Sequence, residues 1–90
     1  MTDKEAEQAS FLANRLRKRR RQLASWRRRE GVSCWRAYDI DIPEIPLAID
    51  VYEDALAIAL YKRPYEKDPE EERAWLAAMA KSAAHALEID

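Results

Sequence analysis

The feature that most constrains this chain is an uninterrupted stretch from Asp3 to Glu30 that contains neither proline nor glycine. It is rich in Ala, Leu, Arg, Gln and Glu, and Gly31, of the residue type most favoured just past a helix end, follows it. At about 100° per residue, its apolar side chains form a stripe only about 80° wide, interrupted by Arg19. Those side chains are Leu12, Leu16, Leu23 and Trp26. The stretch therefore predicts one long helix that buries a narrow face.

Chain length and composition limit the rest of the fold. With 90 residues the chain has room for one small domain, and its 48% hydrophobic content can form a core beneath a heavily charged surface. A core of this size leaves a stability of only about 3–5 kcal/mol, so a partner is expected. A single cysteine and a single histidine exclude an intramolecular disulfide and a four-ligand zinc site within one chain. A single glycine excludes glycine-rich phosphate loops.

After the helix, the pattern changes to strands. Residues 33–38 have the composition of a short strand, and residues 39–46, with two prolines, are expected to form a loop. Apolar residues then alternate on both sides of Glu53-Asp54, which predicts an antiparallel hairpin. Asp68-Pro69 followed by three glutamates predicts a helix start, with the helix running to about Leu87. The expected class is α+β: a basic helix over residues 1–31, and a small module over residues 32–90 with about three antiparallel strands and an amphipathic helix.

Charge is divided unevenly along the chain. Residues 1–36 hold eleven Lys or Arg and four acids, whereas residues 37–90 hold five and thirteen, although the net charge is only −1. The basic part is therefore expected either to face a polyanion or to pack against the acidic part. Crowded arginines repel one another, and a phosphate backbone would relieve that repulsion.

The candidate RNA-binding residues are the cations of this basic part. They are Arg15, Arg17, Lys18, Arg20, Arg21, Arg27, Arg28, Arg29 and Arg36. Trp26, Trp35 and Tyr38 could stack on unpaired bases, but for Trp35 and Tyr38 a place in the core is the favoured interpretation.

The residues available for catalysis do not form a convincing set. Cys34 begins a strand and is interpreted as a small buried residue, while His85 fits a surface position near a helix end. Asp39 and Asp41 are interpreted as part of a turn rather than as a carboxylate pair. We therefore expect no catalytic residue, no cofactor-binding residue and no metal site. No apolar run approaches the about 18 residues of a membrane span and no signal peptide is evident, so the chain is expected to be cytoplasmic.

Several unusual pieces of the sequence together resemble one family. The segments that carry the resemblance are Leu12 to Leu16, Trp26 to Asp39, Asp41 to Glu44 and Leu47 to Tyr52. Over about residues 11–65, the chain resembles the region that precedes the catalytic domain in the N7-guanine half of bacterial 23S rRNA guanine N2/N7 methyltransferases and in related S-adenosylmethionine-dependent enzymes. The resemblance implies a strand–strand–helix–strand–strand module followed by a Rossmann-like methyltransferase domain. Ala59-Leu60-Tyr61 departs from the Gln-Glu-Tyr-like ending typical of that family.

What the resemblance implies for function is an accessory role. S-adenosylmethionine is the cofactor of the family, but the chain ends at Asp90, before the family's cofactor-binding domain, so no cofactor is expected in this chain. The expected function is that of a module or fragment of a 23S rRNA methyltransferase, which assists RNA binding and docks on a catalytic domain supplied in cis or in trans. Two alternatives stay open: a stand-alone RNA- or ribosome-binding protein, and a protein-interaction module with an acidic partner. No membrane partner is expected.

Overall fold

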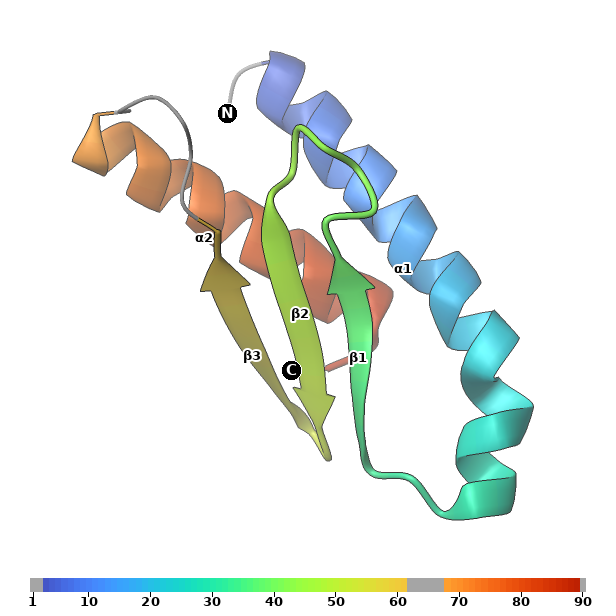
Figure 1. The fold of residues 1–90 in the computed structure, drawn as a ribbon. Coiled ribbons are helices and arrows are strands. Elements are labelled where there is room, and N and C mark those ends of the chain that lie inside the picture. The colour runs from blue at the N-terminus through green and yellow to red at the C-terminus, as the bar shows by residue number, and fades with distance from the viewer. Residues whose placement is uncertain (1–2, 62–67, 90) are drawn as a thin grey trace.

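The computed structural model describes residues 3–61 and 68–89, and in that part the chain forms two helices and three strands. Their order is α1 (Asp3–Glu30), β1 (Cys34–Asp39), β2 (Leu47–Tyr52), β3 (Ala55–Leu60) and α2 (Pro69–Ala86). Figure 1 shows the strands side by side, with α2 crossing behind them and α1 along one side. The α+β class expected from the sequence is confirmed.

The ends of both helices are set by the residues that the sequence indicates. Gly31 has a φ of +63°, and the N–H of Val32 donates to the carbonyl of Arg27 at 3.0 Å, which closes α1 in a Schellman arrangement. At the start of α2, the Asp68 carboxylate accepts from the N–H of Glu71 at 3.3 Å, and Pro69 occupies the first turn. The predicted limits of α1 are therefore confirmed.

The sheet is antiparallel throughout, with β2 between β1 and β3. β2 and β3 pair in regular register from Leu47–Leu60 to Tyr52–Ala55. Between β1 and β2 the register shifts by one residue between Arg36 and Tyr38. This bulge leaves Arg36 opposite Asp50 on the outer face and lets Tyr38, two residues on, enter the core.

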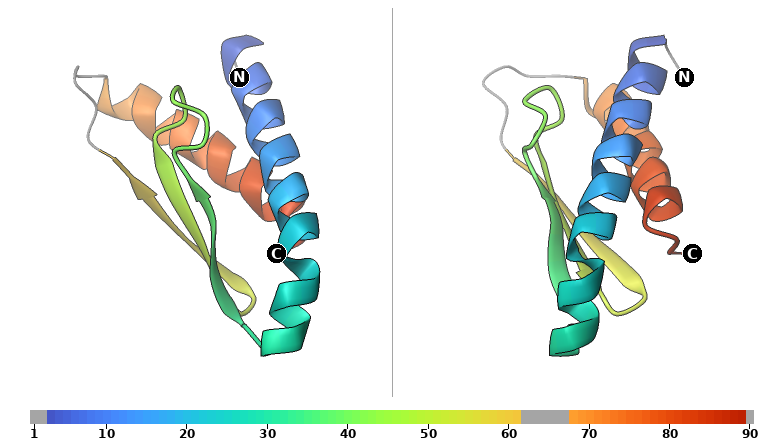
Figure 2. Two further views of the ribbon diagram at one scale, coloured as in Figure 1. Left: turned by 45° about the vertical axis from the view of Figure 1, so that its right-hand side comes forward. Right: turned by 90° about the vertical axis from the view of Figure 1, so that its right-hand side faces the viewer.

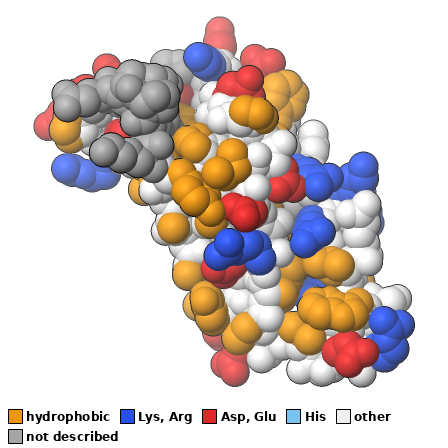
Figure 3. Space-filling view, viewed as in Figure 1, with side chains coloured by type: hydrophobic (Ala, Val, Ile, Leu, Met, Phe, Trp, Pro, Cys, Tyr) orange, Lys and Arg blue, Asp and Glu red, His pale blue; other side chains and the backbone are white. Residues whose placement is uncertain are grey.

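Both helices cover the same face of the sheet, and they also pack against each other (Figure 2). The core between these two layers is formed by Leu12, Leu16, Trp35, Tyr38, Ile45, Leu47, Ile49, Trp75, Met79 and Ala83. The outer face of the sheet is left open, and there hydrophobic side chains lie beside charged ones (Figure 3).

The buried face of α1 differs in part from the predicted stripe, and α2 buries the face that contains Trp75, Met79 and Ala83. In α1, Leu12 and Leu16 are fully buried, but Trp26 is 40% exposed because the C-terminal part of α1 extends past the end of α2 (Figure 1). In α2, Trp75 is buried whereas Leu76 is only partly buried. The Trp75 indole N–H donates to Gln8 of α1 at 2.8 Å and so links the two helices. Within the described residues, neither helix combines the length and the apolar character that crossing a membrane requires.

Candidate nucleic-acid interface

Two hollows lie on opposite sides of α1, and several of its arginines line them. The first hollow has a volume of about 600 Å³ and lies between α1 and the end of β1. It is lined by Arg15, Arg19, Arg36, Tyr38, Asp39 and Asp41. We call it the Arg19 cleft. Arg19 is not among the predicted RNA-binding residues, because it lies within the apolar stripe of the helix and its role depends on which elements pack beside it.

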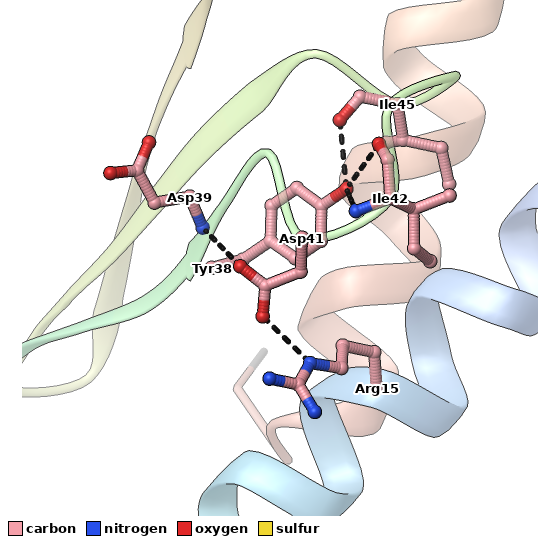
Figure 4. Close-up of polar contacts among 6 residues, drawn as sticks. All are labelled: Arg15, Tyr38, Asp39, Asp41, Ile42 and Ile45. Carbon is pink, nitrogen blue, oxygen red and sulfur yellow. Dashed lines mark hydrogen bonds and ion pairs between the residues drawn. The ribbon is translucent and has the colours of Figure 1, made fainter.

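Two of the three arginines in the Arg19 cleft are already paired. The Nε of Arg15 lies 2.6 Å from the Asp41 carboxylate (Figure 4), and the Nε of Arg36 lies 2.8 Å from Asp50. Arg19 makes no ion pair within residues 3–61 and 68–89. It is therefore the cation of this cleft that a phosphate can approach without first displacing a described carboxylate.

The pair between Arg36 and Asp50 is bidentate, because Arg36 Nη2 also donates to the second oxygen of Asp50 at 3.1 Å. These hydrogen bonds raise the pKa of Arg36 and lower the pKa of Asp50 from their ordinary values. The carboxylate of Asp39 forms a second ion pair with Arg36, with Oδ2 3.6 Å from Nη1. Arg36 therefore lies on the outer face of the sheet, but Asp50 and Asp39 largely neutralise its positive charge.

Tyr38 holds the loop that forms the end of this cleft. Its hydroxyl accepts from the N–H of Ile42 at 3.0 Å and lies 2.8 Å from the carbonyl oxygen of Ile45, to which it can donate (Figure 4). Burial raises the pKa of Tyr38 to about 12. In the same loop, Asp41 accepts from the backbone N–H of Asp39 at 3.3 Å, so the two aspartates form a turn, as the sequence indicated.

The second hollow lies on the opposite side of α1, beside its C-terminal half. Arg20, Arg21, Ala24, Arg27, Arg28 and Val32 line this space of about 430 Å³, which we call the arginine hollow. Arg20 pairs with Glu88 at 2.6 Å, and the guanidinium of Arg27 lies 4.5 Å from the centroid of the Trp35 ring. Four of the nine predicted RNA-binding residues are therefore brought together here.

The remaining predicted cations on α1 point outward. Arg17 and Lys18 are exposed, and Arg17 donates to Asn14 at 3.4 Å. Arg29 is exposed and lies 3.4 Å from its neighbour Glu30. These three side chains lie around the helix rather than in either hollow, as expected for consecutive cations.

Cys34 is the one among the remaining candidate residues whose position differs from the prediction. Trp35 and Tyr38 are buried, which confirms their place in the core. Cys34 is exposed, so its interpretation as a buried residue was wrong: β1 turns Trp35 inward and thereby turns its neighbour outward. His85 lies exposed in the last turn of α2. Within the described ranges, no group of three His, Cys, Asp or Glu side chains could hold a metal ion.

Fold and surface together define a small α+β module in which an arginine-rich helix lies on one face of a three-stranded sheet. No protein-family model matches the chain. The comparison with curated proteins is more specific. The chain is 41% identical over 85 residues to a Pseudomonas fluorescens protein named ribosomal RNA large subunit methyltransferase K/L. That match covers 94% of this chain and 11% of the relative.

Proteins of the same name in other bacteria match equally well. The identity is 40% for the Pseudomonas putida protein, over 94% of this chain and 12% of the relative. It is also 40% for the Methylococcus capsulatus protein, over 93% of this chain and 12% of the relative. The resemblance predicted from the sequence is confirmed: this chain is homologous to a short segment of ribosomal RNA large subunit methyltransferases K/L, and it spans about one ninth of their length.

Proposed function

We propose that this chain acts as the RNA-holding module of an rRNA methyltransferase. The names of its relatives support rRNA as the substrate class, and the arginines on both sides of α1 supply the charge that a phosphate backbone requires. The RNA-contacting residues in this proposal are the nine predicted cations together with Arg19.

The ion pairs made by α1 support the proposal independently of the number of its cations. In the described part of the chain, the ion pairs from α1 to acids outside it are Arg15–Asp41 and Arg20–Glu88. Arg17, Arg21 and Arg28 make no ion pair there, so the acidic part does not neutralise the helix. Since exposed pairs contribute only about 0–1 kcal/mol each, this crowding is better explained by an external polyanion.

Catalysis is assigned to a different part of the methyltransferase. In the proposal, S-adenosylmethionine binds to a catalytic domain, and this module docks on that domain in cis or in trans. The role of this chain is to hold the rRNA near the catalytic domain in the cytoplasm, where ribosomal RNA is available to it.

The proposal is tested by measuring how salt affects binding of the 90-residue chain to fluorescently labelled fragments of 23S rRNA. If about five phosphates are neutralised, the slope of log K against log[salt] should be about −0.7 for each phosphate on single strands. Replacing Arg17, Arg20, Arg21 and Arg28 by Ala should weaken binding and flatten the slope.

A matched control removes cations from the other helix. Arg73→Ala and Lys81→Ala change exposed residues of α2 and should leave the slope nearly unchanged. Binding that depends neither on salt nor on the four arginines of α1 would reject the proposal. Tight, saturable binding to an acidic protein in place of RNA would favour the protein-interaction alternative.

A further inference from the structure

Arg27 contacts the rest of the protein without the help of a described carboxylate. Its guanidinium stacks on the Trp35 ring at 4.5 Å, and its Nη2 donates to the backbone carbonyl of Arg20 at 3.4 Å. Its Nε is buried without a hydrogen-bond partner in the structure. Arg27 makes no ion pair with a carboxylate of the described residues. The side chain is therefore oriented in advance, but its charge is not matched.

Arg27 also separates two adjoining hollows. One is the arginine hollow, and the other is a cleft of about 480 Å³ at the end of α2. The lining of this cleft consists of Arg20, Arg27, Val32, Ser33, Trp35, Val51, Glu53, Asp54, Leu87, Glu88 and Ile89. We call it the mixed cleft. Arg20, Arg27 and Val32 line both spaces, so the two hollows adjoin at these residues, and we call the pair the groove.

The two halves of the groove differ in chemistry. The arginine hollow holds four guanidinium groups and no carboxylate, which suits a phosphate. Burial and repulsion from Arg20 and Arg28 lower the pKa of Arg27, and an anion in the hollow would relieve that repulsion.

The mixed cleft combines an apolar surface with hydrogen-bond acceptors. Val32 and Ile89 are partly exposed there and offer apolar contacts to the flat face of a nucleobase, while Val51 and Leu87 form buried parts of the wall. Glu53 and Asp54 make no ion pair within the described residues, and their carboxylates can accept from an exocyclic amino group. Glu88 is already bound to Arg20, so the free acceptors lie on the side of the β2–β3 turn.

We propose that this groove binds one unpaired nucleotide of the RNA, with its phosphate on Arg27 in the arginine hollow and an amino-bearing base in the mixed cleft. This inference rests on the proposed RNA-binding function. A base inside the cleft cannot be paired, so the groove selects single-stranded segments or loops over a continuous duplex.

The first experiment compares two RNAs of equal charge. A short single-stranded RNA and an abasic oligonucleotide of equal length are titrated into the 90-residue chain at one salt concentration. The abasic strand should bind about tenfold more weakly. Ser33→Phe, which fills the mixed cleft without changing charge, should reduce this difference to about twofold or less. Ser25→Phe, on the exposed surface of α1, is the matched control and should keep it.

The second experiment tests the carboxylates with two bases of similar size. Oligocytidine carries an exocyclic amino group and should bind a few fold more tightly than oligouridine. The double variant Glu53→Gln, Asp54→Asn should lose that preference, whatever it does to overall affinity. This ratio remains informative if Ser33→Phe fails to fold.

The outcomes separate the two proposals. RNA binding with the expected salt slope but equal affinity for the abasic strand would overturn the nucleotide site and leave the proposed function standing. Absence of any RNA binding would overturn both. An abasic penalty that Ser33→Phe removes, together with loss of affinity in Arg27→Met but little change in Arg73→Met on the exposed surface of α2, would establish the site.

Discussion

The guanidinium of Arg36 and the carboxylate of Asp50 meet across β1 and β2 in a two-point contact, with Nε–Oδ1 at 2.8 Å and Nη2–Oδ2 at 3.1 Å. Regular pairing from Cys34 to Arg36 places Arg36 directly opposite Asp50, and the bulge that follows turns Tyr38 inward. Arg36, a predicted RNA-binding residue, is therefore already engaged in an ion pair with Asp50. Arg19, in the same cleft, carries no such partner among the described residues.

The first prediction follows from this pair. Asp50→Asn should free the guanidinium of Arg36 for a phosphate, so RNA affinity at low salt should rise a few fold and the salt slope should steepen by about 0.7. Glu44→Gln removes one acid from the nearby loop and controls for net charge. If the two variants change the slope equally, Arg36 does not contact RNA in the way predicted.

The second prediction concerns acid stability. Since hydrogen bonding from Arg36 lowers the folded-state pKa of Asp50, this pair contributes stability above the unfolded-state pKa of about 3.9 and loses it as the pH falls through the folded value. The melting temperature of Asp50→Asn should therefore fall less than that of the parent chain between about pH 5 and pH 3. If the melting temperatures of the two proteins fall equally over this pH range, the Arg36–Asp50 pair does not contribute the predicted stability.

The sequence could predict elements whose ends are set by local chemistry. Gly31 ends α1 through its own backbone conformation, and Asp68 caps α2 through its carboxylate, which accepts from the N–H of Glu71 three residues on. It could not predict Trp75 as a core residue, because Trp75 packs into a core formed by residues far away in the chain and bonds to Gln8, 67 residues away. Local patterns contain no information about such a contact.

The candidate site was predictable to the same extent. A count of charges was enough to select the arginines of α1 as a group. Their division into two hollows could not be predicted, since it depends on which elements lie beside the helix: β1 beside Arg19, and Trp35 with the end of α2 beside Arg27. The exposed position of Cys34 follows from the inward turn of Trp35, which composition alone did not indicate.

The third prediction concerns the loop that closes the Arg19 cleft. Tyr38→Phe removes the hydroxyl that bonds the backbone of Ile42 and Ile45, leaving buried backbone groups without that partner. The free energy of unfolding should fall by about 1–3 kcal/mol, measured by urea denaturation. Tyr52→Phe, at a side chain that is 50% exposed, should change it little. Equal losses in the two variants would show that the loop does not depend on Tyr38.

The fourth prediction concerns the cofactor. Gly31 lies at the end of α1 with a positive φ, so it serves the helix end rather than a nucleotide-binding loop. We therefore expect the 90-residue chain alone neither to bind S-adenosylmethionine nor to methylate rRNA. Calorimetric titration checks the first point, with a full-length relative as the positive control. Micromolar binding by the chain alone would contradict the prediction.

The last prediction is that further segments of a longer methyltransferase stabilise this module. Among the described residues, β3 pairs with β2 alone, and its inward side chains Leu56, Ile58 and Leu60 are only partly buried. An edge strand of this composition, without a charged residue, favours pairing with another strand or self-association.

The relatives supply a segment with which to test this. Fusing the chain to the region that follows the matching segment in the Pseudomonas fluorescens relative should raise the melting temperature by several degrees, because added burial at β3 stabilises the folded state. Light scattering should then show less self-association than for the 90-residue chain. Lys in place of Ala57, on the outer face of β3, should reduce self-association of the short chain and provides a control for edge pairing. A short chain that is monomeric and melts cooperatively above about 65 °C, with no gain from the fusion, would show that β3 needs no further partner.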